Sequence, residues 1–335
     1  MEKPISESET SHKPRELYEI KITPVGENTN TFKWIRSHPK VKVLAFNTIG
    51  GGRRDYIYTI KDGDPRYQIE SDETIDLPSN LTLMRDVKLD RLVIAKHGNR
   101  KAGGMLEMGN IPGEAHMGGV HEHPNIVTIH DIAGDEERGL FMIQEYLPNG
   151  NLDEWIKMEH NINEVGKVIN QVSAALEHIH LKKRLVFGDM KPKNIGFDSN
   201  WNAKIYDFGI AEEMNKEGIA HSIGSGTPNY EAPEQRGMVL GVQTDVYSLA
   251  ATIFTILVQE TESPGNIKSD RDVFEQQTGV ELCLKKKYFE ELGVEQVEKL
   301  SLFLRKALSK DPENRHGSVA EFNREFQKII ANRKK

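Results

Sequence analysis

Three short motifs in the second half of the chain constrain its fold more than any other feature. The first is the run VFGDMKPKNIGFD at residues 186–198, in which Pro192 prevents a new helix from forming. The second is Asp-Phe-Gly at 207–209, which follows the strand-like AKIY. The third is GTPNYEAPEQ at 226–235, which precedes the apolar segment TDVYSLAATIF. Their order and spacing, more than any one motif, predict a site built on loops and strand ends.

The polar residues of these motifs suit a divalent cation bound together with phosphate. Asp189, Asp207 and Asn194 offer carboxylate and amide oxygens, the ligands that Mg²⁺ prefers. A carboxylate close to a positive charge, as Asp189 is to Lys191, suits the orientation of a hydroxyl group towards a phosphoryl group. Each residue alone has an ordinary explanation, an Asx turn for Asp189 and a strand-end turn for Asp207. Only the combined set predicts phosphate chemistry.

The secondary-structure pattern changes along the chain from strands to helices. The runs YEIKI, KVKVLAF and YIYTI are strand-like, and so are LTLMRDV and RLVIAK, which a polar turn at 88–90 joins. A glycine triplet at 50–52 predicts a hairpin turn, because no helix pattern follows it as a phosphate loop would require. Beyond about residue 163, EVGKVINQVSAALEHIH and VEKLSLFLRKAL have apolar residues at helical spacing. Strands followed by helices predict an α+β fold in two lobes.

Composition excludes several other classes of protein. Of 335 residues, 37% are hydrophobic and 28% charged, which argues against wholesale disorder. The net charge of −7 argues against a broad basic surface for nucleic acid. The polar start of the chain is not a signal peptide, and the longest apolar run, 249–258, is about half a membrane span. Cys283 is the only cysteine, which excludes disulfides within the chain. We therefore expect a cytoplasmic protein with neither nucleic acid nor membrane as a partner.

Taken in order, the three motifs resemble those of the eukaryotic-type Ser/Thr protein kinases. The resemblance runs from about Ile69 to Lys335. It implies a small strand-rich N-lobe, a large helical C-lobe, and transfer of the γ-phosphoryl group of ATP to a hydroxyl group of a protein substrate. Mg²⁺ would be the cofactor, with Mn²⁺ as an alternative. The expected parts are a disordered lead (1–16), a strand-rich extension of unknown role that could bind a regulatory partner (17–68), the N-lobe with the hinge (69–147) and the C-lobe (148–335).

The resemblance assigns the chemistry to four residues of the C-lobe. Asp189 would orient the substrate hydroxyl, and Lys191 would contact the γ-phosphate. Asn194 and Asp207 would hold the magnesium ion. Lys191, together with Thr227, resembles the Ser/Thr branch of the family more than the tyrosine branch. Three further residues match structural positions of the family: Glu234, Asp245 and Arg315.

The resemblance also assigns the nucleotide contacts. Lys96 stands where the family has the lysine that holds the α and β phosphates, and Glu114 stands where its C-helix partner would be. Glycines crowd the segment around Glu114, which predicts a helix that is short or ordered only on binding. Gln144 falls at the gatekeeper position. Glu145 and Leu147 follow it on the hinge, whose backbone reads adenine.

The sequence departs from the family at the phosphate loop and around the base. Thr74, Asp76 and Ser79 stand where the family has three glycines, which predicts weak ATP affinity or a loop held away from the phosphates. Ile94 is larger than the alanine usual above the base, whereas Gly196 offers no side chain below it. Either the two changes together shift the base pocket and partly keep its volume, or they are unrelated to each other.

A third departure concerns activation and leaves other readings open. Phe187-Gly188 replaces the usual His-Arg, so a phosphorylated activation segment would lack its cationic partner, and Ser222, Ser225 and Thr227 are not expected to act as an on-switch. A kinase-fold binding module with little catalysis remains an alternative. So does a small-molecule phosphotransferase, because of the Gly-Asp pair before Asn194. A metal site made of His116, His121 and His123 competes with a simple family turn at 123–125.

Overall fold

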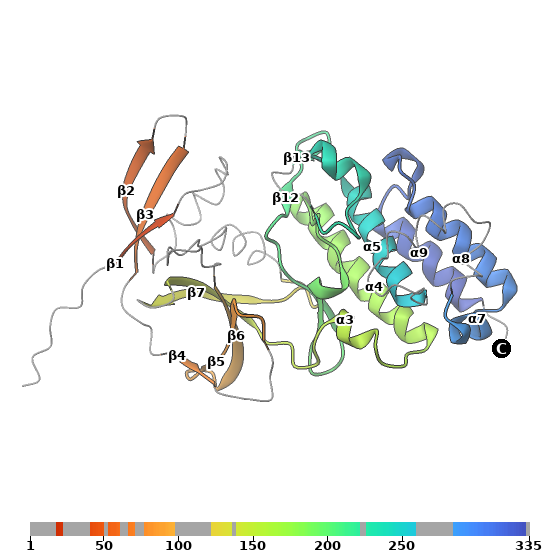
Figure 1. Ribbon diagram of the computed structural model, residues 1–335, viewed down its shortest axis with the longest axis horizontal. Coiled ribbons are helices and arrows are strands. Elements are labelled where there is room, and N and C mark those ends of the chain that lie inside the picture. The colour runs from red at the N-terminus through yellow and green to blue at the C-terminus, as the bar shows by residue number, and fades with distance from the viewer. Residues whose placement is uncertain are drawn as a thin grey trace, which may run out of the picture. The chain divides into compact units, whose positions relative to one another are not determined.

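The chain forms two compact units, each of which is described by itself. The computed structural model describes residues 18–22, 41–49, 53–60, 66–70, 77–97, 122–135, 139–221, 226–258 and 284–332. The strand-rich unit comprises residues up to 112 together with 131–143, and the helix-rich unit comprises 113–130 together with 144–335 (Figure 1). Antiparallel strands in one unit and helices in the other confirm the expected α+β class.

A five-stranded sheet is the main element of the strand-rich unit. Its order is β4-β5-β6-β8-β7, and the strands are β4 (Tyr67–Ile69), β5 (Leu81–Asp86), β6 (Arg91–His97), β7 (Ile129–Asp135) and β8 (Gly139–Glu145). The β5–β6 pair runs from Leu81 opposite Lys96 to Asp86 opposite Arg91, so the expected hairpin with its polar turn is confirmed. Apolar side chains from these strands form one buried cluster: Tyr67, Met84, Val93, Ala95, Phe141 and Ile143.

At the end of β5, the buried carboxylate of Asp86 binds the residue directly before the edge strand β4. Asp86 is fully buried and accepts two hydrogen bonds from the Arg66 guanidinium, at 2.7 and 2.6 Å. The bonds from Arg66 lower the pKa of the Asp86 carboxyl to about 2. Tyr67 donates its hydroxyl to Asp131 at 3.1 Å. Arg66 and Tyr67, which precede β5 in the chain, are thereby connected to β5 and to β7.

A second, three-stranded sheet precedes the first in the chain. Strands β1 (Tyr18–Ile22), β2 (Val41–Ile49) and β3 (Arg53–Ile60) pair antiparallel in the order β1-β3-β2, with an irregularity in β2 between Val43 and Ala45. Ile49 pairs with Arg53, the register that a hairpin through 50–52 requires, although those glycines lie outside the described residues. The strands expected within 17–68 are therefore confirmed, and their role stays a prediction.

Six α-helices of the helix-rich unit lie within the described residues. They are α3 (Leu152–Trp155), α4 (Ile162–His178), α5 (Val242–Leu257), α7 (Lys286–Leu292), α8 (Val294–Ala307) and α9 (Val319–Ala331). Figure 1 shows α4, α5, α8 and α9 side by side, and their apolar faces form the largest buried cluster of the described residues. The helices expected from the apolar spacing in α4 and α8 are confirmed. None of the helices in the described ranges is long and apolar enough to cross a membrane.

Helix α4 is the central support of this unit. Asn161 caps its first turn by accepting hydrogen bonds from the backbone of Asn163 and Glu164, and Glu164 bonds back to the Asn161 backbone. Where α4 meets α9, a Cβ atom at Gly166 would lie 2.3 Å from the Ile330 side chain. Glycine at this position therefore allows the two helices to approach closely.

Short elements after α4 carry or flank the motifs at 186–198 and 207–209. A π-helical turn, η1 (Ile179–Lys183), ends at Arg184, and β9 (Leu185–Val186) follows. A 3₁₀ turn, η2 (Pro192–Asn194), leads into the hairpin of β10 (Ile195–Phe197) and β11 (Ala203–Ile205). The remaining short elements are β12 (Glu212–Glu213), β13 (Ala220–His221), η3 (Pro233–Gly237), β14 (Val239–Leu240) and η5 (Pro312–Asn314).

Candidate active site

The loop that carries Asp189 is fixed from within the helix-rich unit by a buried aspartate. Asp245, in the first turn of α5, has no exposed surface and accepts hydrogen bonds from the backbone N–H groups of Phe187 and Gly188, both at 2.8 Å. His180 Nε2 bonds to the same carboxylate at 2.7 Å. Gly188 has φ +75°, a left-handed conformation that favours glycine. Asp245 thus holds the chain directly before Asp189.

The Asp189 carboxylate lies at the centre of a polar network. One oxygen, Oδ2, accepts from Lys191 Nζ at 2.7 Å and from Asn194 Nδ2 at 3.1 Å. The other, Oδ1, accepts from the Thr227 hydroxyl at 2.8 Å and from the Thr227 backbone at 3.2 Å. Lys191 also donates to the Thr227 hydroxyl at 2.7 Å. The structure therefore brings together three of the predicted residues and Thr227.

Gln235, which the sequence reasoning missed, attaches the 226–235 segment to the Asp189 loop. Its side chain is 2% exposed, donates to the carbonyl of Gly188 at 2.9 Å and accepts from the backbone of Ala232 at 2.8 Å. A Cβ atom at Gly226 would lie 2.9 Å from the Gln235 amide, so a larger residue there would displace the Gln235 side chain. The position of Gln235 directly after Ala-Pro-Glu was the available signal.

Asn194 bonds to the backbone of the residue directly before the Asp-Phe-Gly motif. Asn194 is buried, and its amide group donates both to the carboxylate and to the carbonyl of Asp189, the latter at 2.8 Å. The backbone N–H of Tyr206 donates to the Asn194 carbonyl at 3.0 Å, which places Asp207 one residue further on. Asp207 has φ +70°, an unusual conformation for a residue other than glycine and one found at functional sites. The buried ring of Phe208 contacts Phe187 edge-on at 5.2 Å.

The oxygen atoms of Asn194 and Asp207 are of the type that magnesium ions prefer as ligands. Both hydrogen bonds of the Asn194 amide nitrogen go to Asp189, which turns the amide oxygen of Asn194 away from that residue. Asp207 adds a carboxylate, and Mg²⁺ prefers such oxygen ligands. No cluster of three or more His, Cys, Asp or Glu residues suited to a metal ion occurs in the part of the chain that the structure describes. Of the three histidines considered for a metal site, only His123 lies there, and its Nδ1 accepts from the Asn125 backbone at 3.1 Å in a turn.

The hinge residues lie in β8 and directly after it. Gln144 is buried, and the Glu145 carboxylate pairs with Lys204 at 3.0 Å and accepts from the Thr128 backbone at 3.1 Å. Leu147 reaches Gly196, because a Cβ atom at Gly196 would lie 2.4 Å from Leu147 Cδ1. The structure therefore brings Leu147 and Gly196 together, and the space below the expected base is filled by a side chain from the hinge.

The remaining predicted nucleotide contacts belong to the strand-rich unit or lie outside the described residues. Lys96 is partly exposed near the end of β6, and Ile94 is 5% exposed two residues earlier. Val93 and Ala95 point into the sheet's apolar cluster, so strand alternation puts Ile94 and Lys96 together on the other face. Glu114 lies outside the described residues, as do Thr74 and Asp76 of the phosphate-loop segment. Ser222 and Ser225 also lie outside them.

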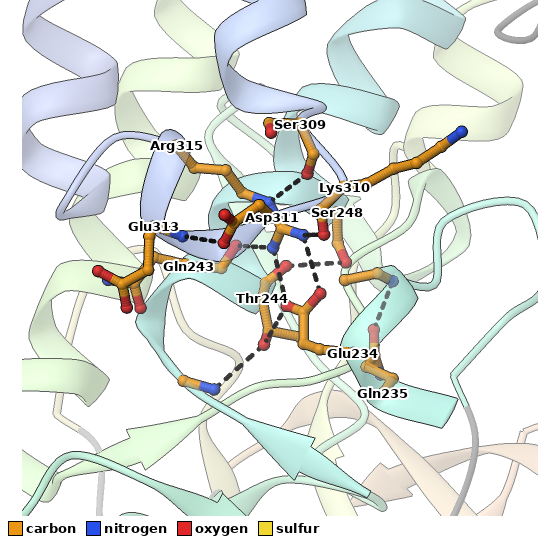
Figure 2. Close-up of polar contacts among 12 residues, drawn as sticks. Glu234, Gln235, Gln243, Thr244, Ser248, Ser309, Lys310, Asp311, Glu313 and Arg315 are labelled. Carbon is orange, nitrogen blue, oxygen red and sulfur yellow. Dashed lines mark hydrogen bonds and ion pairs between the residues drawn. The ribbon is translucent and has the colours of Figure 1, made fainter. Parts of the chain in front are cut away.

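A buried ion pair supports the 226–235 segment from below. Arg315 is 4% exposed and makes two parallel bonds to Glu234, at 2.7 and 2.8 Å. The same guanidinium donates to the carbonyls of Ser309 and Gln243, and Thr244 donates its hydroxyl to Glu234 at 2.9 Å (Figure 2). Within this cluster the charge of Arg315 is matched by that of Glu234, and each donor has an acceptor. The role of the ion pair is therefore structural.

Comparisons with known proteins agree with this arrangement. A family model described as the protein kinase domain matches residues 79–327, so the chain belongs to the protein kinase family. A serine/threonine-protein kinase of Bacillus subtilis, PrkC, is 33% identical over 148 residues, which are 43% of this chain and 22% of that protein. The yeast cell cycle serine/threonine-protein kinase CDC5/MSD2 (Saccharomyces cerevisiae) is 34% identical over 144 residues, 41% of this chain and 20% of that protein.

A longer match is to a probable serine/threonine-protein kinase of Lactococcus lactis, PknB. It is 29% identical over 210 residues, which cover 59% of this chain and 31% of that protein. The matched regions therefore span less than a third of each of these three relatives. The family assignment agrees with the resemblance seen in the sequence motifs.

Proposed function

We propose that the chain is an ATP-dependent protein serine/threonine kinase, which transfers the γ-phosphoryl group of ATP to a hydroxyl group of a protein substrate. The observation that carries the proposal is the network in which Asp189 is held by Lys191, Asn194 and Thr227. Phosphoryl transfer depends mainly on positioning and on stabilisation of charge, and this network supplies both.

Each residue of the network has a separate task in this proposal. Asp189 accepts a hydrogen bond from the substrate hydroxyl, aligns its oxygen with the phosphorus and takes its proton as the new bond forms. Lys191 lies 2.7 Å from Asp189, which would hold the attacking hydroxyl. The Lys191 ammonium group would therefore lie beside the γ-phosphoryl oxygens and neutralise their charge. Thr227 orients both side chains through its hydroxyl group.

The proposed cofactor is Mg²⁺, with Mn²⁺ as an alternative. Asn194 and Asp207 would hold it through oxygen atoms, and the bound ion would neutralise the charge of the phosphates. Asn194 is held by two bonds to Asp189, and the shorter one goes to the Asp189 backbone carbonyl, which a substitution at 189 keeps. Lys96, Glu114, Ile94, Glu145 and Leu147 are the further proposed contacts of ATP, with Gly196 below the base.

We infer a protein substrate, a cytoplasmic location and a regulatory partner at the strands of residues 17–68. The division at 69–147 and 148–335 into N-lobe with hinge and C-lobe is likewise proposed. ATP affinity is expected to be weak, because Thr74, Asp76 and Ser79 stand where the family has glycines.

A kinase-fold binding module with little catalysis is the second candidate, and one contact favours it. Leu147 and Tyr206 both occupy the space at Gly196, below the expected base, which changes the pocket that the family's relatives use. A small-molecule phosphotransferase is less well supported, because Thr227 of the 226–235 segment bonds directly to Lys191 and Asp189.

The two candidates differ in an autophosphorylation and phosphate-release assay. The wild type would be incubated with ATP and Mg²⁺ or Mn²⁺ beside Asp207→Asn, with Glu298→Gln, an exposed carboxylate on α8, as the matched control. The proposal expects activity in the wild type and in Glu298→Gln and its loss in a folded Asp207→Asn protein. Absence of activity in all three, despite a thermal shift with nucleotide, would favour the binding module.

A further inference from the structure

Tyr206, directly before Asp207, is a large aromatic residue at the centre of the candidate site. Its backbone follows β11 and bonds to Asn194, and its hydroxyl group donates to the carbonyl of Lys193 at 2.5 Å. The ring therefore extends from residue 206 back to residue 193, across the end of the β10–β11 hairpin. The side chain is partly exposed.

The ring lies directly on the backbone of Gly196. A Cβ atom added there would lie 3.0 Å from Tyr206 Cε1 and 2.4 Å from Leu147 Cδ1, both closer than carbon atoms pack. A side chain at 196 and the present positions of Tyr206 and Leu147 are therefore mutually exclusive. Glycine at 196 is explained by this packing, and the two side chains replace the one that residue 196 lacks.

The ring is held at both ends. Its hydroxyl group bonds to the Lys193 carbonyl, and its Cε1 edge lies against Gly196, where Leu147 also packs.

We propose that the Tyr206 ring, seated on Gly196 beside Leu147, is the surface on which the purine base of the nucleotide stacks, which makes Tyr206 a specificity-determining residue. This inference rests on the proposed function, because it takes the bound molecule to be a nucleoside triphosphate. An aromatic face is well suited to a base, and loss of one stacking ring commonly weakens binding by about tenfold or more.

The test is equilibrium binding of Mg·ATP and of Mg·tripolyphosphate, which has no base, to the full chain. Tyr206→Ala should weaken Mg·ATP binding by about 10- to 50-fold and leave tripolyphosphate binding unchanged. Tyr206→Phe keeps the ring and should stay within about threefold of the wild type, because only the bond to Lys193 is lost. Equal or tighter ATP binding by Tyr206→Ala would overturn the inference, because the ring would then be an obstruction.

Three further variants control for folding and for the contact between residues 196 and 206. Trp201→Asn removes an exposed aromatic residue from the turn of the same hairpin, at φ +58° where asparagine is tolerated, and should leave ATP binding unchanged. Gly196→Leu alone should weaken ATP binding, and Gly196→Leu with Tyr206→Ala should recover part of it, since the collision with the Tyr206 ring is removed and only the one with Leu147 stays. If Gly196→Leu does not fold, Tyr206→Ala against Tyr206→Phe still decides.

The outcomes separate the inference from the proposed function. Phosphate transfer by the wild type, with equal ATP binding by Tyr206→Ala, would overturn the inference alone. ATP binding that depends on the Tyr206 ring, without any phosphate transfer, would contradict the proposed function alone. A wild type that binds tripolyphosphate but no ATP would contradict both.

Discussion

Thr227 donates its hydroxyl hydrogen to the Asp189 carboxylate across 2.8 Å, although the two residues are 38 positions apart in the chain. The same hydroxyl accepts from Lys191 at 2.7 Å, so one small side chain orders both the carboxylate and the ammonium group. The 226–235 segment is therefore part of the candidate site itself. The hydroxyl both donates and accepts in this network. That Thr227 is not a phosphorylated on-switch stays a prediction.

The first prediction concerns this hydroxyl. Thr227→Val keeps the shape of the side chain but removes one donor and one acceptor, so Asp189 and Lys191 lose their alignment. We expect kcat for phosphate transfer to fall by about 10- to 100-fold, with KM for ATP little changed. Thr227→Ser keeps the hydroxyl and should retain most of the activity. Equal activity in Thr227→Val and Thr227→Ser would contradict the role given to this hydroxyl.

A second prediction addresses the support below Asp189. Asp245→Asn replaces one acceptor oxygen by an amide donor, which must face either the N–H group of Gly188 or the N–H group of Phe187 together with His180. The variant should lose about 2–4 kcal/mol of unfolding free energy and most of its activity. Urea unfolding and a transfer assay measure the two effects. A fully stable and active variant would show that Asp245 does not hold the loop.

The buried ion pair gives a third prediction. Arg315→Met leaves the Glu234 carboxylate without its bidentate partner, and the free energy of unfolding should fall by about 2–4 kcal/mol. Lys299→Met breaks an exposed pair, Lys299 with Glu295 at 2.7 Å, and should cost less than about 0.5 kcal/mol. Similar costs in the two variants would contradict the structural role assigned to Arg315.

A fourth prediction follows from the low pKa of Asp86. Its folded value of about 2 lies below the ordinary 3.8, so the native state keeps this carboxylate charged more firmly than the unfolded chain does. The stabilisation is complete above about pH 4 and is lost as the pH falls through about 2. Asp86→Asn should therefore be less stable near neutral pH and show a shallower decline in stability from pH 4 to 2.

The control for this pH effect is Asp90→Asn. Asp90 is largely exposed beside Arg85, and asparagine accepts its left-handed backbone at φ +46°. Its stability curve should follow that of the wild type. An unchanged pH dependence in Asp86→Asn would show that the Arg66 pair does not stabilise the sheet.

The sequence was sufficient to predict those helices and strands whose signal lies in neighbouring residues. The strand-like apolar run in RLVIAK and the apolar spacing in EVGKVINQVSAALEHIH predicted β6 and α4, because both signals are properties of neighbouring residues. The grouping of Asp189, Lys191 and Asn194 was equally available, because all three lie within six residues on one loop. Their roles came from the resemblance and stay proposals.

Contacts between segments that lie far apart in the sequence could not be predicted in this way. Gly196 was interpreted as an empty position, whereas Leu147 and Tyr206 fill it from outside β10. Gln235 reaches Gly188 across 47 positions, and its place directly after Ala-Pro-Glu does not by itself show which residue it contacts. Such contacts depend on how the loops pack in three dimensions, which spacing along the chain does not determine.

The central claim is that Asp189 directs a hydroxyl group onto the γ-phosphate. The most direct measurement is single-turnover transfer of labelled phosphate from Mg·ATP to serine or threonine by the wild type and by Asp189→Asn, with ATP binding measured on the same samples. We predict transfer by the wild type and a fall of about 100-fold or more in Asp189→Asn, with ATP affinity changed by less than about threefold. Equal transfer rates in the two proteins, or none in a wild type that binds ATP, would contradict the account.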